Sequence, residues 1–436
     1  MSGYLLKGGR VVDPSSGVDA VGDLLIADRV IAEIGDSIDP GSIEVIDVSG
    51  LVVAPGLVDM HTHVREPGRE DEETIASAAR AAAAGGYTAI CTMPNTDPVA
   101  DTASVVEKVW ALGREAGLVQ VVPAGALSKG LVGESMADIG EMARSVARVR
   151  LFTDDGKGVQ SALFARRAME YLIAFDGIYA EHCEDESLAL GGQMHEGERS
   201  IALGMRGIPA EAEELMAARD VALSRLTGCR LHLLHISTAG TVELVRRAKS
   251  EGVPVTCEAT PHHFTLTDEA LEGYDPNAKV NPPLRSEDHR DAVIAGLADG
   301  TIDAIATDHA PHAIEEKDIE FQYAPPGLVG LETSLALTLT ELFHKGHLSL
   351  SDAIERLSCA PARILGLPDH GTLAVGGPAN VVVFDPDASW EVDPHLFHSL
   401  SRNTPFGGRK VTGRVVHTFF NGNPTTRDSE LVGVSV

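Results

Sequence analysis

An alternation of apolar strand segments and helical segments in the middle of the chain limits its fold more than any other feature. The stretches between the expected strands carry helical patterns, such as Glu73–Ala84, which ends at Gly85-Gly86, and Ala210–Leu226. This alternation is typical of βα units that build a parallel sheet. The expected strands are Val52–Asp59, Tyr87–Met93, Val119–Gly125, Val149–Asp155, Ile178–His182, Arg230–Ile236, Pro254–Glu258 and Ile302–Asp308. These eight units predict a closed (β/α)8 barrel of the TIM type.

The two ends of the chain have a different pattern, in which short β-rich runs alternate with turns. Examples are Val30–Ile34 near the start and Ala379–Asp385 near the end. Hairpin-like segments of this kind predict a small β-sandwich domain built from both termini. We therefore expect a β-domain of residues 1–53 plus 368–436 and a barrel of residues 54–367. A total length of 436 residues suits a barrel with a small appended domain.

The composition argues against several classes of partner. A net charge of -29 disfavours nucleic acid and anionic membranes, because both attract basic patches. The sequence has no run of about 18 apolar residues, and Met1–Lys7 lacks the long apolar core of a signal peptide. The five cysteines are scattered and form no CxxC pair, which predicts a reduced, cytoplasmic location. The expected partner is a small-molecule substrate.

The first expected strand runs into the segment Asp59-Met60-His61-Thr62-His63. Side chains two apart on a strand share one face, so Asp59, His61 and His63 are expected to project together. Two adjacent neutral imidazoles can bind one divalent cation. An HxH pair alone is more often accidental than ligating, so the argument for a metal depends on the other strand ends.

Four further expected strands also end in residue types that bind metals. These residues are Asp154 and Asp155, His182, His235 and Asp308. Catalytic groups of a barrel lie at the C-terminal ends of its strands. Four histidines and two carboxylates exceed the needs of one catalytic zinc and suit two metals that share a carboxylate. Two cations that share a hydroxide predict hydrolysis of an amide, ester or phosphoester.

Alternatives stay open at several of these positions. Asp154 and Asp155 precede a glycine and would also suit a simple turn, and the pattern does not choose between them. His182 would also suit a core histidine bonded to a carboxylate. His232 and His235 are three apart, so we expect only one of them to face the interior, and His235 is nearer the strand end.

Seven ordered motifs resemble those of the dihydroorotase branch of the amidohydrolase superfamily, in its class I bacterial type. They are Pro55–His63 with its continuation Val64–Gly68, Met93–Thr96, Phe152–Gly156, His182–Asp185, His235–Thr238, Asn281–Arg285 and Ala306–His312. The motifs span nearly the whole chain. The resemblance implies the reversible conversion of L-dihydroorotate and N-carbamoyl-L-aspartate, a step of pyrimidine synthesis.

The resemblance also implies a metal ligand set for two Zn2+ ions. His61, His63 and Asp308 would bind one ion and His182 and His235 the other, with Asp155 as the bridge. Asp308 would in addition be the catalytic acid and base. Many relatives bridge the metals with a carboxylated lysine, but the fourth strand has none, and Lys157 lies beyond it in a loop.

A set of substrate contacts follows from the same resemblance. It consists of His63, Arg65, Asn95, Asn281, His312, Pro326 and Gly327. The planar fork of Arg65 can bind a substrate carboxylate with two bonds, although pairing with Glu66 or Glu70 is the alternative. Relatives often carry an aromatic residue where Pro326 stands. The charge-rich segment His309–Gly327 is expected to act as a lid.

Two other interpretations compete with this one. Hydantoinases and allantoinases share the expected fold and metals, but they usually carry the bridging lysine and lack the context of Arg65. A metal-free barrel that scaffolds aspartate transcarbamoylase would have lost ligands, whereas this chain keeps the full set. We expect a homodimer, and association with aspartate transcarbamoylase stays open.

Overall fold

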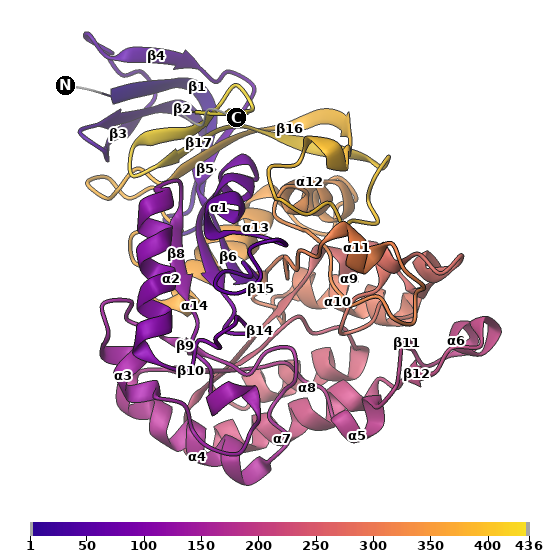
Figure 1. Cartoon of the computed structure of the whole chain (residues 1–436). Helices are drawn as coiled ribbons and strands as arrows, with labels where there is room; N and C mark the ends of the chain where they lie inside the picture. Colours follow the sequence, from indigo (N-terminus) through magenta and orange to yellow (C-terminus); the bar gives the residue numbers. More distant parts are fainter. Residues whose placement is uncertain (1–2, 433–436) are drawn as a thin grey trace.

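The computed structural model describes residues 3–432, in which a sheet at one end lies over a region of alternating strands and helices (Figure 1). Residues 1–2 and 433–436, which the predicted β-domain includes, lie outside the described part. No helix in residues 3–432 combines the length and the apolar character that crossing a membrane requires.

Both ends of the chain contribute to one sheet, which has nine strands within the described residues. These are β1 (Gly3–Asp13), β2 (Val18–Ala27), β3 (Val30–Gly35), β4 (Glu44–Asp47), β5 (Val52–Pro55), β16 (Val381–Glu391), β17 (Lys410–Phe420), β18 (Asn423–Arg427) and β19 (Glu430–Leu431). β5 joins the two halves, because it runs parallel to β1 and antiparallel to β16. The two termini therefore meet in one sheet, as predicted, whereas a two-layered sandwich stays a prediction.

The middle of the chain supplies eight mutually parallel strands among the residues described. They are β6 (Leu57–Thr62), β7 (Tyr87–Thr92), β8 (Gln120–Pro123), β9 (Leu151–Phe152), β10 (Ile178–Glu181), β13 (Arg230–Leu233), β14 (Val255–Ala259) and β15 (Ala304–Ile305). Parallel bridges connect Gly125 to Phe152 and Thr62 to His309. Each of these strands therefore pairs with the next one, from β6 to β15. The ring closes because His309, which follows β15, bridges back to Thr62 in β6.

The bounds predicted for the first strand are wrong. The apolar run from Val52 contains two strands, because β5 belongs to the terminal sheet and β6 starts after Gly56. A Cβ atom at Gly56 would lie 2.2 Å from Thr88 Cγ2, so only glycine fits at this crossing. Periodicity does not show the break because both strands are fully buried. The expected domain boundary at residue 53 falls inside β5.

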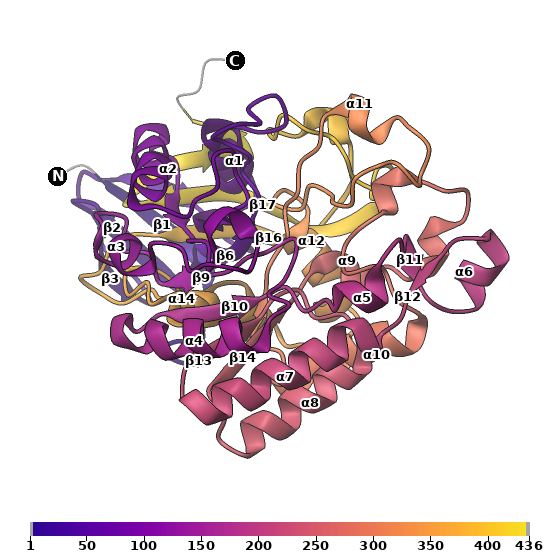
Figure 2. The same ribbon diagram turned by 60° about the horizontal axis from the view of Figure 1, so that its bottom comes forward.

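Helices lie on the outside of the parallel strands (Figure 2). They are α1 (Ile75–Ala84), α2 (Ala103–Ala116), α3 (Ile139–Arg144), α4 (Ala162–Leu172), α5 (Glu186–Ala189), α7 (Glu211–Thr227), α8 (Ala239–Ser250), α9 (Pro261–Thr265), α10 (Glu287–Asp299), α11 (Ile314–Lys317), α12 (Ser334–Thr338), α13 (Leu350–Ile354) and α14 (Ala360–Leu365). A small projecting flap contains β11 (Met194–His195), α6 (Glu198–Leu203) and β12 (Gly207–Ile208). The helices predicted at Glu73–Ala84 and Ala210–Leu226 are α1 and α7, each within two residues of its expected bounds.

The two ends of the parallel strands differ in character. Near the N-terminal ends, Ile178 and Ala304, the first residues of β10 and β15, belong to one buried apolar cluster with Ile364 and Leu365 of α14. The opposite ends carry buried histidines and carboxylates. The fold therefore places its polar groups at the C-terminal ends of the strands, where loops of variable sequence can build a site.

Candidate metal centre

The six residues predicted as metal ligands converge at the C-terminal ends of the parallel strands. His61 lies in β6 and His63 directly after it, and the other four follow β9, β10, β13 and β15: Asp155, His182, His235 and Asp308. All six are buried. Their ligand-type atoms form two groups that share Asp155, one with His61 and His63 and one with His182 and His235.

The carboxylate of Asp155 faces a different pair of histidines with each of its oxygens. Oδ2 lies 3.4 Å from Nε2 of His61 and 3.3 Å from Nε2 of His63. Oδ1 lies 3.4 Å from Nε2 of His235 and 3.6 Å from Nδ1 of His182. A carboxylate shared between two metals has this geometry.

Asp308 completes the group on the His61 side. Its Oδ1 atom lies 3.1 Å from Nε2 of His63 and 3.5 Å from Nε2 of His61. The backbone of Asp308 has a φ angle of 47°, which turns the chain out of the strand conformation at this residue. The side chain thereby reaches the same space as the two histidines.

The cluster fits metal ions because it contains buried polar atoms without hydrogen bonds. Nε2 of His61 and Oδ1 of Asp155 have no hydrogen-bond partner in the described structure. An unsatisfied buried polar atom costs about 1–3 kcal/mol, so a set of them that converges on one space favours an added cation. Imidazole nitrogens with carboxylate oxygens are donors that zinc and similar divalent ions accept.

The electrostatics of the cluster keep its carboxylates ionised. Burial opposes the charge on Asp155, but His61, His182 and His235 outweigh it and hold the pKa of the carboxyl well below its usual range. Burial likewise opposes the charge on Asp308, and the neighbouring His61 and His63 lower its pKa. Ionised carboxylates are the form that binds cations.

The structure separates Asp154 from Asp155, which the sequence pattern could not do. Asp154 turns away from the cluster, and its Oδ1 accepts hydrogen bonds from the backbone N–H groups of Leu127 and Ser128, both at 2.9 Å. Asp154 therefore fixes the loop after β8. Lys157 is exposed, and its backbone N–H donates to the carbonyl of Asp154.

Glu258 in β14 is a residue of the site that the sequence analysis did not select. It is fully buried and accepts a hydrogen bond from Nδ1 of His61 at 2.8 Å and from Nε2 of His232 at 3.1 Å. A carboxylate behind a ligating histidine fixes the orientation of the ring and increases its basicity. The sequence did offer a signal for this residue, because Glu258 is an acidic residue in a mostly apolar strand.

The expectation that only one of His232 and His235 faces the interior is wrong. His232 points to Glu258, and His235 points to Asp155. The alternation of side-chain directions ends with β13 at Leu233, and His235 has a φ angle of 32°. The direction of the His235 side chain therefore does not follow from its spacing to His232.

The expected grouping of Asp59 with the two histidines is also wrong. Its carboxylate accepts hydrogen bonds from Thr307 Oγ1 at 2.5 Å and from the N–H groups of Thr307 and His61. Asp59 therefore connects β6 to the segment after β15. Irregular pairing of β6 with β7 between Asp59 and Thr62 explains why the simple alternation fails here.

Two predicted substrate residues contact the histidines of the cluster. The Asn95 side-chain carbonyl accepts a hydrogen bond from Nδ1 of His63 at 2.9 Å. The amide of Asn281 lies 3.3 Å from Nε2 of His182, and its Oδ1 atom is buried without a partner. Both residues lie beside the cluster, where a bound molecule would meet them.

Arg65 and His312 lie next to each other, 3.5 Å apart between Nη2 and Nε2. Arg65 pairs with Glu72 at 3.2 Å, and neither Glu66 nor Glu70, the partners considered from the sequence, accepts a bond from it. His312 donates from Nε2 to the carbonyl of Pro326 at 2.9 Å. The guanidinium of Arg65 and the imidazole of His312 form one wall beside the cluster.

Pro326 and Gly327 contact this wall through their backbone. The ring of Pro326 is exposed, while its carbonyl bonds to His312. Gly327 has a φ angle of 134°, and a Cβ atom there would lie 2.7 Å from Ala310 Cβ and 3.0 Å from His312 Nε2. Glycine is therefore required where this segment passes His312.

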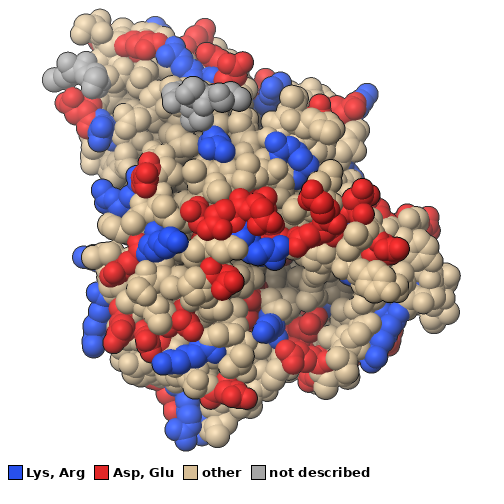
Figure 3. Space-filling model, in the orientation of Figure 1, with Lys and Arg blue, Asp and Glu red and all other residues tan. Residues whose placement is uncertain are grey.

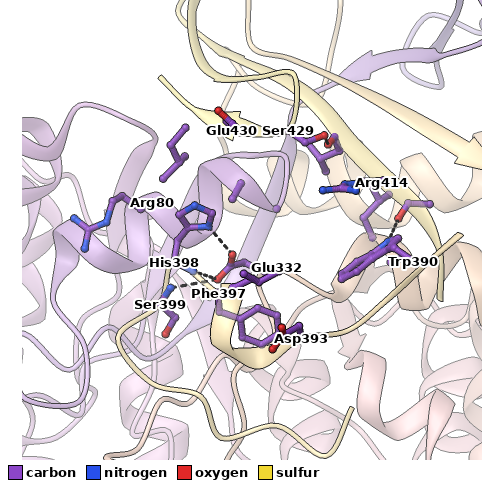
Figure 4. Close-up of a pocket in the computed structure, with 18 of the residues that line it drawn as sticks. Arg80, Glu332, Trp390, Asp393, Phe397, His398, Ser399, Arg414, Ser429 and Glu430 are labelled. Atoms are coloured by element: carbon purple, nitrogen blue, oxygen red, sulfur yellow. Dashed lines mark hydrogen bonds and ion pairs between the residues drawn. The ribbon is translucent and has the colours of Figure 1, made fainter. Parts of the chain in front are cut away.

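The surface has a hollow bordered by acidic side chains on the face seen in Figure 3. A cavity of about 1010 Å³ lies elsewhere, between the terminal sheet and helices α1 and α12. Its lining includes Trp390, Phe397 and Glu332, which accepts a hydrogen bond from Nδ1 of His398 at 2.9 Å (Figure 4). None of the predicted site residues lines this cavity, so it is separate from the metal centre.

Solved structures that match this fold include hydantoinases and dihydropyrimidinases. An L-hydantoinase (dihydropyrimidinase) from Arthrobacter aurescens matches with a TM-score of 0.87 and 28% identity, over 99% of this chain and 98% of that one. A dihydropyrimidinase from Brevibacillus agri matches with a TM-score of 0.85 at 23% identity, over 98% and 96% of the two chains. The fold and the cluster therefore define an enzyme of the cyclic amidohydrolase class.

Relatives by sequence identify the branch within this class. A family model described as "Dihydro-orotase-like" matches residues 50–241. The dihydroorotase of Pelotomaculum thermopropionicum is 50% identical over 424 residues, which are 97% of this chain and 98% of that protein. The dihydroorotase of Streptomyces coelicolor is 48% identical over 434 residues, 99% of this chain and all of that protein. The chain belongs to the dihydroorotase family.

Proposed function

We propose that the protein interconverts L-dihydroorotate and N-carbamoyl-L-aspartate, with two zinc ions in the cluster. The observation that carries the proposal is the position of Asp155, whose two oxygens face two separate histidine pairs beside the wall formed by Arg65 and His312. A cyclic amide that bears a carboxylate needs both features, one for hydrolysis and one for recognition.

Divalent ions held by the six ligands would supply an activated water and polarise the ring carbonyl. Asp308 takes the proton of the attacking water and delivers it to the leaving ring nitrogen. His61 and His63 lower the pKa of Asp308, so its carboxylate is in the ionised form that can accept a proton. In the direction of ring closure, the same carboxylate removes the proton from the attacking nitrogen.

The remaining side chains bind and orient the substrate. Arg65 and His312 pair with its carboxylate, since a planar guanidinium can donate two parallel bonds. Asn95 and Asn281 donate to its ring carbonyl oxygens from positions beside His63 and His182. The backbone at Gly327 passes close to the substrate, next to His312.

The proposal includes the architecture in which the enzyme works. The ring of parallel pairing from β6 to β15 supports the (β/α)8 barrel expected over residues 54–367, with its first strand starting at Leu57 because β5 belongs to the terminal sheet. The sheet shared by the two termini supports a separate β-domain of residues 1–53 plus 368–436. A cytoplasmic homodimer remains our expectation, with association with aspartate transcarbamoylase as the further possibility to be tested by co-purification.

A hydantoinase is the second candidate, favoured by the fold match to the Arthrobacter aurescens enzyme. An assay of the metal-loaded protein on dihydroorotate, hydantoin and allantoin separates the candidates. We expect kcat/KM to be highest for dihydroorotate. A preference for hydantoin or allantoin would overturn the substrate assignment, and no turnover of any of the three would favour a scaffolding role.

A further inference from the structure

Glu72 is a buried carboxylate that contacts both residues of the wall formed by Arg65 and His312. It lies in the loop between β6 and α1, and only 1% of its surface is exposed. Oε2 lies 3.2 Å from Nε of Arg65, and Oε1 accepts a hydrogen bond from Nδ1 of His312 at 3.1 Å. One side chain thereby connects two loops that are far apart in the sequence.

The contact with Glu72 engages the Nε atom of Arg65 rather than its two terminal nitrogens. Nε of Arg65 faces Glu72 and donates to the carbonyl of Pro311 at 3.1 Å. The terminal nitrogens lie on the other side, where Nη2 approaches His312. A guanidinium held at its Nε edge presents its two terminal nitrogens in one plane, which is the geometry that a carboxylate accepts.

The contact with His312 fixes the direction of the imidazole. Nδ1 faces Glu72 and, at 3.2 Å, Oε2 of Glu316 in α11. Nε2 faces the carbonyl of Pro326 and the guanidinium of Arg65. The ring is therefore oriented by carboxylates on one side, so that its other side points to the space beside Arg65.

Glu72 also has a contact that points away from this wall. Arg69, which is about half exposed, donates to Oε1 of Glu72 at 2.8 Å and reaches Glu316. This exposed pair contributes little by itself, because solvent screens it. The buried contacts to Arg65 and His312 are the ones in which the carboxylate has a large effect on the position of its partners.

We propose that Glu72 is a positioning residue for substrate recognition, which holds Arg65 and His312 in the arrangement that binds a ring carboxylate. The inference rests on the proposed function, because it assumes a substrate that carries a carboxylate. Glu72 itself does not touch the substrate. It acts through the two side chains that do.

The test compares Glu72→Gln with Glu70→Gln in the full-length, metal-loaded protein. Glu70 is an exposed acid of the same loop that only accepts a bond from the N–H of Gly68, so it controls for the loss of one negative charge. Steady-state kinetics on dihydroorotate give KM and kcat. Calorimetry with orotate, an unreactive ring carboxylate, gives a dissociation constant that does not depend on turnover.

We expect Glu72→Gln to raise KM and the dissociation constant of orotate about tenfold, with kcat within about twofold. Glu70→Gln leaves all three values unchanged. A second mutation, Arg65→Met, supplies a double-mutant cycle, in which Glu72→Gln raises KM less than it does in the wild type, because only its effect through His312 remains. Metal content of Glu72→Gln stays at the wild-type value, which separates a loss of substrate binding from a loss of the metals.

Several results would overturn the positioning role. They are an unchanged orotate affinity in Glu72→Gln, a loss of kcat without a change in KM, full additivity with Arg65→Met, and no binding of orotate by the wild type. If Glu72→Gln does not fold, Glu72→Asp is judged by the same criteria, because it keeps the charge and breaks the contacts. If the wild type binds orotate but does not turn over dihydroorotate, the proposed function is refuted and the positioning role of Glu72 is not.

Discussion

Glu258 gives the sharpest prediction about how the protein holds its metals. Its carboxylate accepts bonds from His61 and His232, at 2.8 Å and 3.1 Å, in a fully buried position. In Glu258→Gln the amide oxygen can accept from one of these rings only, and the amide N–H2 group faces the other. His61 then loses either its orientation or the tautomer in which Nε2 is free for a metal.

The expected magnitude follows from the place of Glu258 behind a ligand. Loss of such a carboxylate typically weakens metal binding about 10–100-fold, which is about 1.4–2.8 kcal/mol. Competition for zinc with a chromophoric chelator measures this change. Glu341→Gln is the matched control, because Glu341 is also buried and bonded to Arg409 and Lys345 but is not part of the cluster. Zinc affinity within twofold of the wild type in Glu258→Gln would refute the reasoning.

Glu258 also predicts a dependence of stability on pH. Burial opposes its ionisation, but the hydrogen bonds from His232 and His61 outweigh burial and lower its pKa from 4.5 to about 2. A carboxylate with a depressed folded pKa stabilises the protein above its unfolded pKa, and this contribution is lost as the pH falls toward the folded pKa. Between pH 4.5 and 2, we expect the unfolding free energy of metal-free wild type to fall about 3 kcal/mol more than that of Glu258→Gln.

Two further predictions concern turnover of dihydroorotate. Asp308→Asn is expected to lower kcat about 10²–10⁴-fold with little change in KM, because the amide cannot transfer the proton. A rate near that of the wild type would exclude Asp308 as the acid and base. Arg65→Met is expected to raise KM about tenfold or more with kcat largely preserved, since the lost bonds to the carboxylate exist equally before and during reaction. Steady-state kinetics check both, and an unchanged KM in Arg65→Met would exclude its contact with substrate.

The convergence of the ligand-type residues was predictable from the sequence because it depends on the order of strands. The C-terminal ends of parallel strands meet at one edge, so residues at these ends must approach one another whatever their exact rotamers. His182 and Asp308 were placed in this way. The C-terminal end of α1 was also predictable, because Gly85 follows it, whereas its start at Ile75 lies after the expected start at Glu73.

The directions of individual side chains were not predictable, because they depend on backbone irregularities. His235 and Asp308 have positive φ angles beyond the ends of their strands, where strand parity no longer applies. Asp154 and Asp155 are distinguished only by the N–H groups of the loop after β8, which lie far away in the sequence. The contact of Glu72 with His312 spans 240 residues, and no local pattern signals it.

Metal content and activity measured together test the central claim most directly, which is that Asp155 serves two metal ions. Chelator-stripped protein is titrated with zinc while bound metal and turnover of dihydroorotate are followed. The account predicts that activity rises until two equivalents are bound per chain, and that Asp155→Ala binds less than one equivalent tightly and stays inactive. Full activity at one equivalent, or two tightly bound ions in Asp155→Ala, would contradict it.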